Sequence, residues 1–103
     1  MDIIDLNEIE PKEKFKPHRV IQQDEVQVVI LPFKPGQGLK VHTTPVDVFF
    51  YIVEGKAEIT VGDEVKQIEE GSIVLSPKDV PHNVRNTSDG ETKVMVVKTQ
   101  NPK

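Results

Sequence analysis

Two histidines, His42 and His82, carry the chemistry that this sequence offers most clearly. An unperturbed imidazole has a pKa of about 6.5 and, when neutral, can ligate a divalent metal ion or hydrogen-bond an organic ligand. A third histidine, His18, stands beside Arg19 and is interpreted as a surface residue that could still swing in as a further ligand. The chain contains no cysteine, which excludes disulfides, thiolate catalysis and iron–sulfur ligation.

Each of the two histidines lies in a segment with regularly spaced glycine and proline. The first segment runs Gly36-x5-His42-x-Thr44-x3-Val48-x6-Gly55, and the second runs Gly71-x5-Pro77-x-Asp79-x2-His82-x3-Asn86. Together they resemble the paired motifs of the cupin family, G-x5-H-x-H-x3,4-E-x6-G and G-x5-P-x-G-x2-H-x3-N. The resemblance spans about Val28 to Val97.

The resemblance implies an all-β fold, the double-stranded β-helix or jelly-roll barrel of two facing sheets. It also implies a cavity inside the barrel, with His42 and His82 on facing sides. Gly55 would then serve a tight hairpin. Asp79, which replaces a glycine of the second motif, is tolerable because aspartate also visits left-handed backbone conformations.

The ligand set departs from the family pattern, because Thr44 stands where a second histidine belongs and Val48 where a glutamate belongs. A catalytic metal normally has three protein ligands or more, and His42 and His82 fall one short. No cofactor is therefore certain, and a divalent metal (Zn, Fe, Mn or Ni) would be held weakly. The search for a third ligand would begin with His18 and Asp47.

Strand alternation predicts which neighbours share the site. Lys40, His42 and Thr44 fall on one face of an extended segment. The family spacing places Val48, Phe50 and Ile52 inward, and Asp47 on the opposite face. The predicted ligand-binding residues are His42, Thr44, His82, Lys40, Val48 and Phe50, with Ile52 and Val84 as further walls. Arg85 is interpreted as a solvated strand residue that could clamp a carboxylate at the rim.

These residues must be positioned by strands. Apolar and β-branched runs in the sequence predict five strands. They cover Glu25–Phe33, Val48–Glu54, Ala57–Val61, Ser72–Leu75 and Val94–Lys98, with turn residues between them. A single short helical turn is expected within Asp5–Lys14, because Pro11 interrupts that segment. The charged segments 64–70 and 91–93 are expected to be exposed.

The length of 103 residues suits one domain, which we divide into an N-terminal arm (1–17) and a barrel (18–103). The arm carries Ile3, Ile4, Leu6 and Ile9, and could pack on a dimer partner. Small barrels expose sheet edges that invite pairing, so a homodimer is expected.

The net charge is −4 and no cluster of lysine and arginine occurs, which argues against nucleic-acid and anionic membrane partners. The net negative charge of the chain does not favour the binding of acidic ligands either. The absence of a continuous apolar run near the N-terminus and of cysteine favours a cytoplasmic location.

Three functions remain open at this point. The first is a barrel that binds a small molecule in its interior, with an incomplete or weak metal site. The second is a metal-dependent enzyme of dioxygenase or isomerase type that uses His42 and His82. The third is a structural or regulatory dimer with a vestigial cavity. Thr44 and Val48 favour the first over the second.

Overall fold

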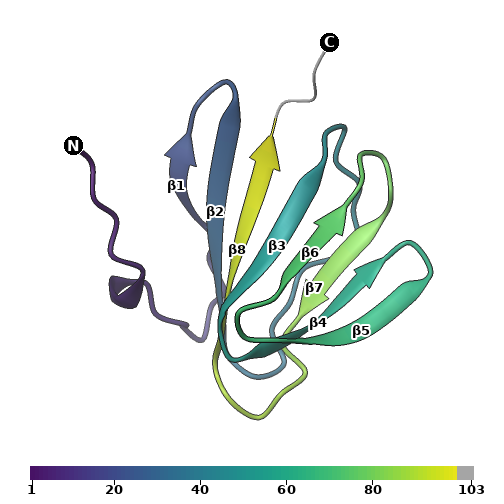
Figure 1. The fold of residues 1–103 in the computed structure, drawn as a ribbon. Helices are drawn as coiled ribbons and strands as arrows, with labels where there is room; N and C mark the ends of the chain where they lie inside the picture. Colours follow the sequence, from purple (N-terminus) through teal and green to yellow (C-terminus); the bar gives the residue numbers. More distant parts are fainter. Residues whose placement is uncertain (100–103) are drawn as a thin grey trace.

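The computed structural model describes residues 1–99, which form eight strands and one 3₁₀ turn, η1 (Leu6–Glu8) (Figure 1). The expected end of the barrel domain at residue 103 lies outside the described residues. The strands are β1 (His18–Gln22), β2 (Val26–Phe33), β3 (Val48–Glu54), β4 (Lys56–Val61), β5 (Glu64–Glu69), β6 (Ile73–Ser76), β7 (His82–Arg85) and β8 (Thr92–Thr99). No helix of this part of the chain is long and apolar enough to cross a membrane.

The strands form two antiparallel sheets. One has five strands in the order β1-β2-β8-β3-β6, and the other has three in the order β5-β4-β7. The chain therefore passes between the sheets several times, as Figure 1 shows for β3 to β4 and for β7 to β8. This is the double-stranded β-helix, so the expected all-β jelly-roll fold is confirmed.

Alternate residues of the strands point into the space between the sheets and form the main core. Phe33, Phe50, Ile52 and Val84 are examples, each at most 1% exposed. Because successive side chains alternate across a strand, one face of each inner strand is apolar and the other is free to meet solvent or a second layer.

The N-terminal arm of the same chain covers part of the outer face of the larger sheet, over β2 and β8. Leu6 and Ile9 pack against Val28, Ile30 and Val97, which explains why β2 is buried on both faces.

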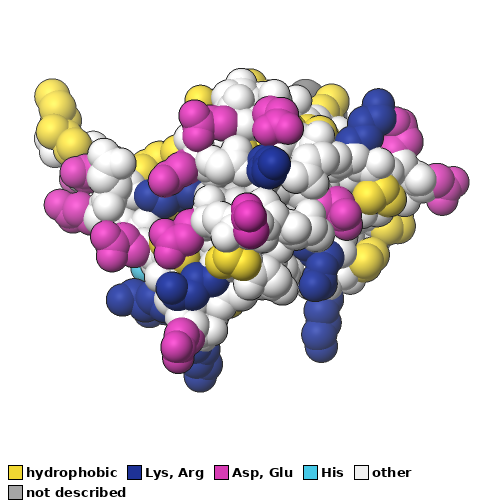
Figure 2. Space-filling model, turned by 90° about the horizontal axis from the view of Figure 1, so that it is seen from below, with side chains coloured by type: hydrophobic (Ala, Val, Ile, Leu, Met, Phe, Trp, Pro, Cys, Tyr) yellow, Lys and Arg dark blue, Asp and Glu magenta, His cyan; other side chains and the backbone are white. Residues whose placement is uncertain are grey.

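Two contacts anchor the arm further along its length. The Lys93 ammonium donates to the Leu6 carbonyl at 2.6 Å, and the Phe15 ring stacks on Phe33 with centroids 4.9 Å apart. Ile3, at 82% exposed, projects beyond these contacts. Figure 2 shows hydrophobic side chains at this end, and acidic and basic side chains interspersed over the rest of the face in view.

Several turns contain a residue with positive φ, and Gly55 and Asp79 of the paired motifs are two of them. Gly55, between β3 and β4, has φ of +78°, and a Cβ there would lie 2.5 Å from the Glu91 carbonyl oxygen. Asp79, before β7, has φ of 65°, as its place in the second motif predicted.

The five predicted strands are present, with ends that differ by at most two residues at either side. Strands β1, β5 and β7 were not predicted. The segment 64–70, expected to be exposed, contains β5, whose residues are exposed except for the half-buried Ile68. The same expectation for 91–93 is wrong, because Thr92 and Lys93 at the start of β8 are 1% and 5% exposed.

Candidate ligand site

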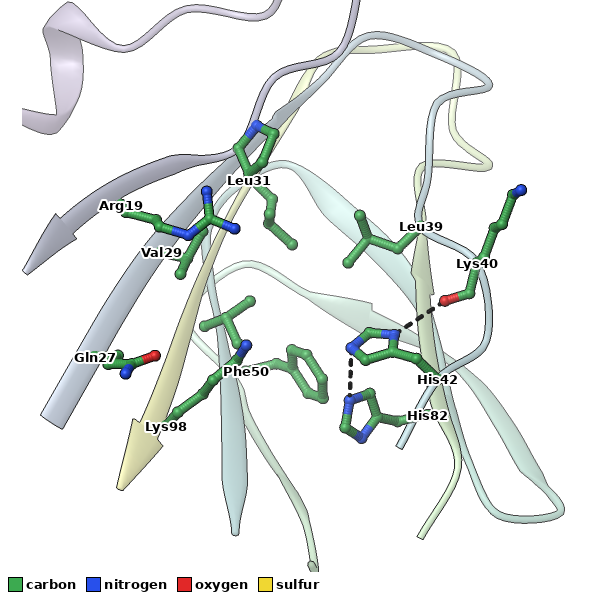
Figure 3. A pocket seen from close by; sticks show the side chains of 12 residues that line it. Arg19, Gln27, Val29, Leu31, Leu39, Lys40, His42, Phe50, His82 and Lys98 are labelled. Carbon is green, nitrogen blue, oxygen red and sulfur yellow. Dashed lines mark hydrogen bonds between the residues drawn. The ribbon is translucent and has the colours of Figure 1, made fainter. Parts of the chain in front are cut away.

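A cavity of about 320 Å³ lies against the inner face of the larger sheet (Figure 3). Its walls combine apolar side chains with a few polar and charged ones. The lining residues are Pro17, Arg19, Gln27, Val29, Leu31, Leu39, Lys40, His42, Phe50, His82, Val96 and Lys98. The strands β1, β2, β3 and β8 supply one wall, and β7 with the connection after β2 supplies the other.

The cavity brings His42 and His82 together. Their backbones form an isolated antiparallel bridge, with His42 N–H donating to the His82 carbonyl at 3.1 Å and the reverse bond at 2.9 Å. This bridge sets both side chains on the same face, so their Nε2 atoms lie 3.2 Å apart. The two rings meet edge to face, with centroids 4.4 Å apart.

The hydrogen-bond partners define where the protons of the neutral pair reside. His42 Nδ1 lies 3.0 Å from the Lys40 carbonyl oxygen, which can only accept, so Nδ1 carries the proton. His42 Nε2 is then an acceptor, and His82 Nε2–H donates to it. His82 Nδ1 in turn accepts from the Ser76 hydroxyl at 2.9 Å. The result is a directed chain of hydrogen bonds from Ser76 to the Lys40 carbonyl.

His82 is held in its neutral form. Its residue is 2% exposed, and the Phe50 ring lies edge-on to the imidazole with centroids 5.4 Å apart. Burial lowers the pKa of His82 below its ordinary value, and the positive charges of His42 and Lys98 lower it further, against an opposing hydrogen bond to the Val80 backbone. His42, by contrast, is exposed at the cavity mouth.

Thr44 and Lys40 both lie close to the two imidazoles. The Thr44 side chain approaches them, and the Lys40 side chain does not. Thr44 is buried, and its hydroxyl oxygen lies 3.4 Å from His82 Nε2. Lys40 contributes its backbone carbonyl to His42, while Figure 3 shows its side chain running away from the imidazoles.

The predicted inward residues of β3 separate into two groups. Phe50 lines the cavity beside His82. Val48 and Ile52 belong to the packed core beneath it, as does Val84 of β7, and none of the three is among the residues that line the cavity.

The other sequence candidates lie elsewhere. His18 pairs with Ile30, whose side chain is in the outer cluster, so His18 is on the sheet face away from the cavity. Asp47 accepts a hydrogen bond from the Lys78 amide at 2.9 Å. Arg85 is exposed on β7, and its side chain covers Gly38 outside the cavity.

Four polar residues of the site were missed by sequence reasoning: Arg19, Gln27, Ser76 and Lys98. Gln27 and Lys98 are cross-strand partners and occupy the same alternation as the core residues Val29 and Val96. The alternation of residues along these two strands could therefore have predicted that Gln27 and Lys98 point inward. Ser76 lies inside the second motif, directly before Pro77, and could have been found there. Arg19 depends on β1, which no strong strand pattern marks.

The donors present do not make a complete metal centre. Two imidazole nitrogens and the neutral hydroxyl of Thr44 converge, whereas a catalytic zinc site has three stronger ligands. Within residues 1–99, no group of three or more His, Cys, Asp or Glu side chains is placed to hold a metal ion. Lys98 lines the same cavity, and its positive charge opposes a divalent cation.

Comparison with known proteins identifies the family of the chain and structures that are similar to it. The Cupin_2 family model, described as a cupin domain, matches residues 29–98. The chain is similar to the crystal structure of TT1209 from Thermus thermophilus, with a TM-score of 0.89, 30% identity, and coverage of 99% of this chain and 100% of that one. It is also similar to an RmlC-like cupin protein from Desulfovibrio desulfuricans, with a TM-score of 0.73, 29% identity, and coverage of 84% and 83%.

Among curated proteins, the chain is similar to protein SchB of Streptomyces halstedii, with 33% identity over 63 residues. The match covers 60% of this chain and 46% of SchB. The chain spans about half the length of the curated relatives it matches.

Proposed function

The chain belongs to the cupin family, and from this premise we propose that this small barrel protein binds a small molecule in its interior, next to His42 and His82. The metal site is incomplete in this proposal, and a ligand hydrogen-bonds the imidazoles in exchange for the bond between their Nε2 atoms. Thr44 and the backbone of Lys40 complete the polar end, Phe50 forms an apolar wall beside it, and Val48 supports it from the core.

One observation carries the proposal: the cavity of about 320 Å³ has apolar walls and two imidazoles that converge at one end. Small-molecule sites are typically concave, largely apolar and equipped with a few convergent polar groups. A volume near the lower end of the usual range, roughly 300–1,000 Å³, suits a small ligand.

Crystals soaked with small carboxylates and with sugars test this function. We expect density between Phe50 and the two imidazoles. His42→Ala should remove that density while the fold is retained, and His18→Ala, on the other sheet face, should not. Repeated density outside the barrel with an empty interior would overturn the proposal and leave a structural or regulatory role with a vestigial cavity.

A metal-dependent cupin enzyme is the second candidate, favoured by the separation of 3.2 Å between the two Nε2 atoms. Two ligands of one zinc ion, each at about 2.0–2.1 Å, come to a similar distance from one another. Metal analysis of freshly purified protein separates the candidates. We expect well under one zinc, iron, manganese or nickel ion per chain, and one tightly held ion per chain would put the enzyme first.

We also propose that the protein forms a homodimer. Support comes from β6, an edge strand of the larger sheet whose Ile73 and Leu75 are 65% and 60% exposed. These two residues border an apolar groove with Ile59 and Ile68 of the smaller sheet. An exposed apolar edge of this kind is suited to the same edge of a second copy.

A further inference from the structure

The charges that line the cavity are opposite in sign to the charge of the whole chain. The chain has 17 acidic and 13 basic residues, yet the described lining contains Arg19, Lys40 and Lys98 and no aspartate or glutamate. The ion pairs formed within residues 1–99 join Lys34 to Glu91, Lys66 to Glu64 and Lys93 to Glu54. Arg19 and Lys98 take part in none of them.

Three neighbouring strands present the polar residues of this wall. Lys98 of β8 is the cross-strand partner of Gln27 of β2, and Arg19 of β1 is the partner of Val29, one inward position further along β2. All of these residues line the cavity. Figure 3 shows Arg19 and Lys98 on one side of the Phe50 ring and the two imidazoles on the other.

The charge of Lys98 is felt within the cavity. It contributes to lowering the pKa of the buried His82, together with burial and His42. An anion between Lys98 and His82 would therefore be attracted by a charge that the protein leaves without a counter-ion in the described residues.

The rest of the cavity lining is apolar and suits the hydrocarbon part of an organic ligand. Val29, Leu31, Leu39, Phe50 and Val96 cover the space between the two polar ends. Phosphate sites are commonly built from backbone N–H groups at a helix N-terminus or a glycine-rich loop, and neither lines this cavity in the part of the chain that the structure describes.

We propose that the cavity binds a small organic carboxylate, with the carboxylate held by Arg19 and Lys98 and the apolar body lying over Phe50. Gln27 offers an amide donor beside them. The inference rests on the proposed function and names the chemical class of its ligand. A guanidinium matches the two oxygens of a carboxylate, and the half-buried Lys98 adds a second positive charge.

Titration of the ¹⁵N-labelled protein with matched pairs of probes tests this assignment. Benzoate and hexanoate are the carboxylates, and benzamide and hexanamide are their neutral counterparts. We expect the carboxylates to shift the amide signals of cavity residues and to bind about tenfold or more tightly than the amides, because charge-assisted hydrogen bonds are lost in the amides. Inorganic phosphate should bind more weakly than either carboxylate.

Variants identify the residues responsible. Arg19→Gln and Lys98→Gln should each weaken carboxylate binding by about tenfold and leave amide binding unchanged. Arg85→Gln is the matched control, because Arg85 is the only other arginine and lies outside the cavity. Thermal unfolding of each variant verifies that the barrel is intact.

The outcomes separate this inference from the proposed function. Equal binding of carboxylates and amides, unaffected by Arg19→Gln and Lys98→Gln, would overturn the carboxylate assignment and leave interior binding in place. Phosphate binding as tight as that of the carboxylates would overturn it as well. Failure of all four organic probes to shift any cavity signal would count against interior binding itself.

Discussion

His42 Nε2 and His82 Nε2 lie 3.2 Å apart, although the two residues are 40 positions apart in the chain. A reciprocal pair of backbone hydrogen bonds holds them in register, and Ser76 and the Lys40 carbonyl occupy the two outer nitrogens. Every ring nitrogen of the neutral pair therefore has a partner. The pair is a fixed part of the barrel, and its protonation has consequences for stability and binding.

Folding stability should fall in mild acid because of His82. Its pKa is lowered in the folded state from the ordinary value of 6.5, so the unfolded chain takes up the proton first. This contribution is fully present above pH 6.5 and is lost as the pH falls from there toward the lowered pKa. The slope cannot exceed about 1.4 kcal/mol per pH unit for one group.

Urea unfolding between neutral pH and mild acid measures that slope. His82→Gln should flatten it, whereas His18→Gln should leave it unchanged. An identical slope in the His82 variant and the unmodified protein would contradict the assignment.

Gly55→Ala should destabilise the barrel more than Gly71→Ala. Both glycines have positive φ (+78° and +86°), so both variants incur backbone strain of about 1 kcal/mol. Only at Gly55 would the new Cβ meet the Glu91 carbonyl oxygen, at 2.5 Å, while nothing lies within 4 Å at Gly71. Equal shifts of the urea midpoint would show that the hairpin relaxes to admit the methyl group.

Thr44→His combined with Val48→Glu should create a strong divalent metal site. The first change places an imidazole beside His82 Nε2, where the Thr44 hydroxyl lies at 3.4 Å, and the second returns a carboxylate to an inward position. Val48→Glu alone should destabilise the apo protein by about 1–3 kcal/mol, because it buries a carboxylate that Lys98, opposite on β8, offsets only in part.

Calorimetric zinc titration and thermal unfolding with and without zinc measure the gain. The double variant should be stabilised by the metal, and each single variant should be stabilised less. A double variant with the zinc affinity of the unmodified protein would refute the expected geometry.

The proposed homodimer should depend on β6. Ile73→Lys with Leu75→Lys places two charges on the exposed edge, where like charges from two copies would meet, so the variant should be monomeric by sedimentation velocity. Val41→Lys is the control, since Val41 is 62% exposed in the connection between β2 and β3. Monomeric unmodified protein at micromolar concentration would contradict the dimer.

The strands that sequence reasoning found are those with a buried apolar face. In β3 the pattern of burial alternates along Val48, Phe50 and Ile52, and the same periodicity is legible in the sequence. Strand β5 carries no such signal, because its residues are exposed except for Ile68, and its strand conformation depends on pairing with β4. Strand β7 contains one apolar residue, Val84, which is too few to show a period.

By itself, the sequence determined an all-β fold, because turn residues and buried alternation are local properties. The resemblance of the two motifs to the cupin pattern further implied that His42 and His82 face each other across the barrel. Only the tertiary structure decided which other residues share the cavity. Lys98 and Gln27 lie at the cavity through cross-strand register, and Arg19 through the addition of β1 to the sheet edge. Register and sheet order arise from pairing between distant segments, which no local pattern encodes.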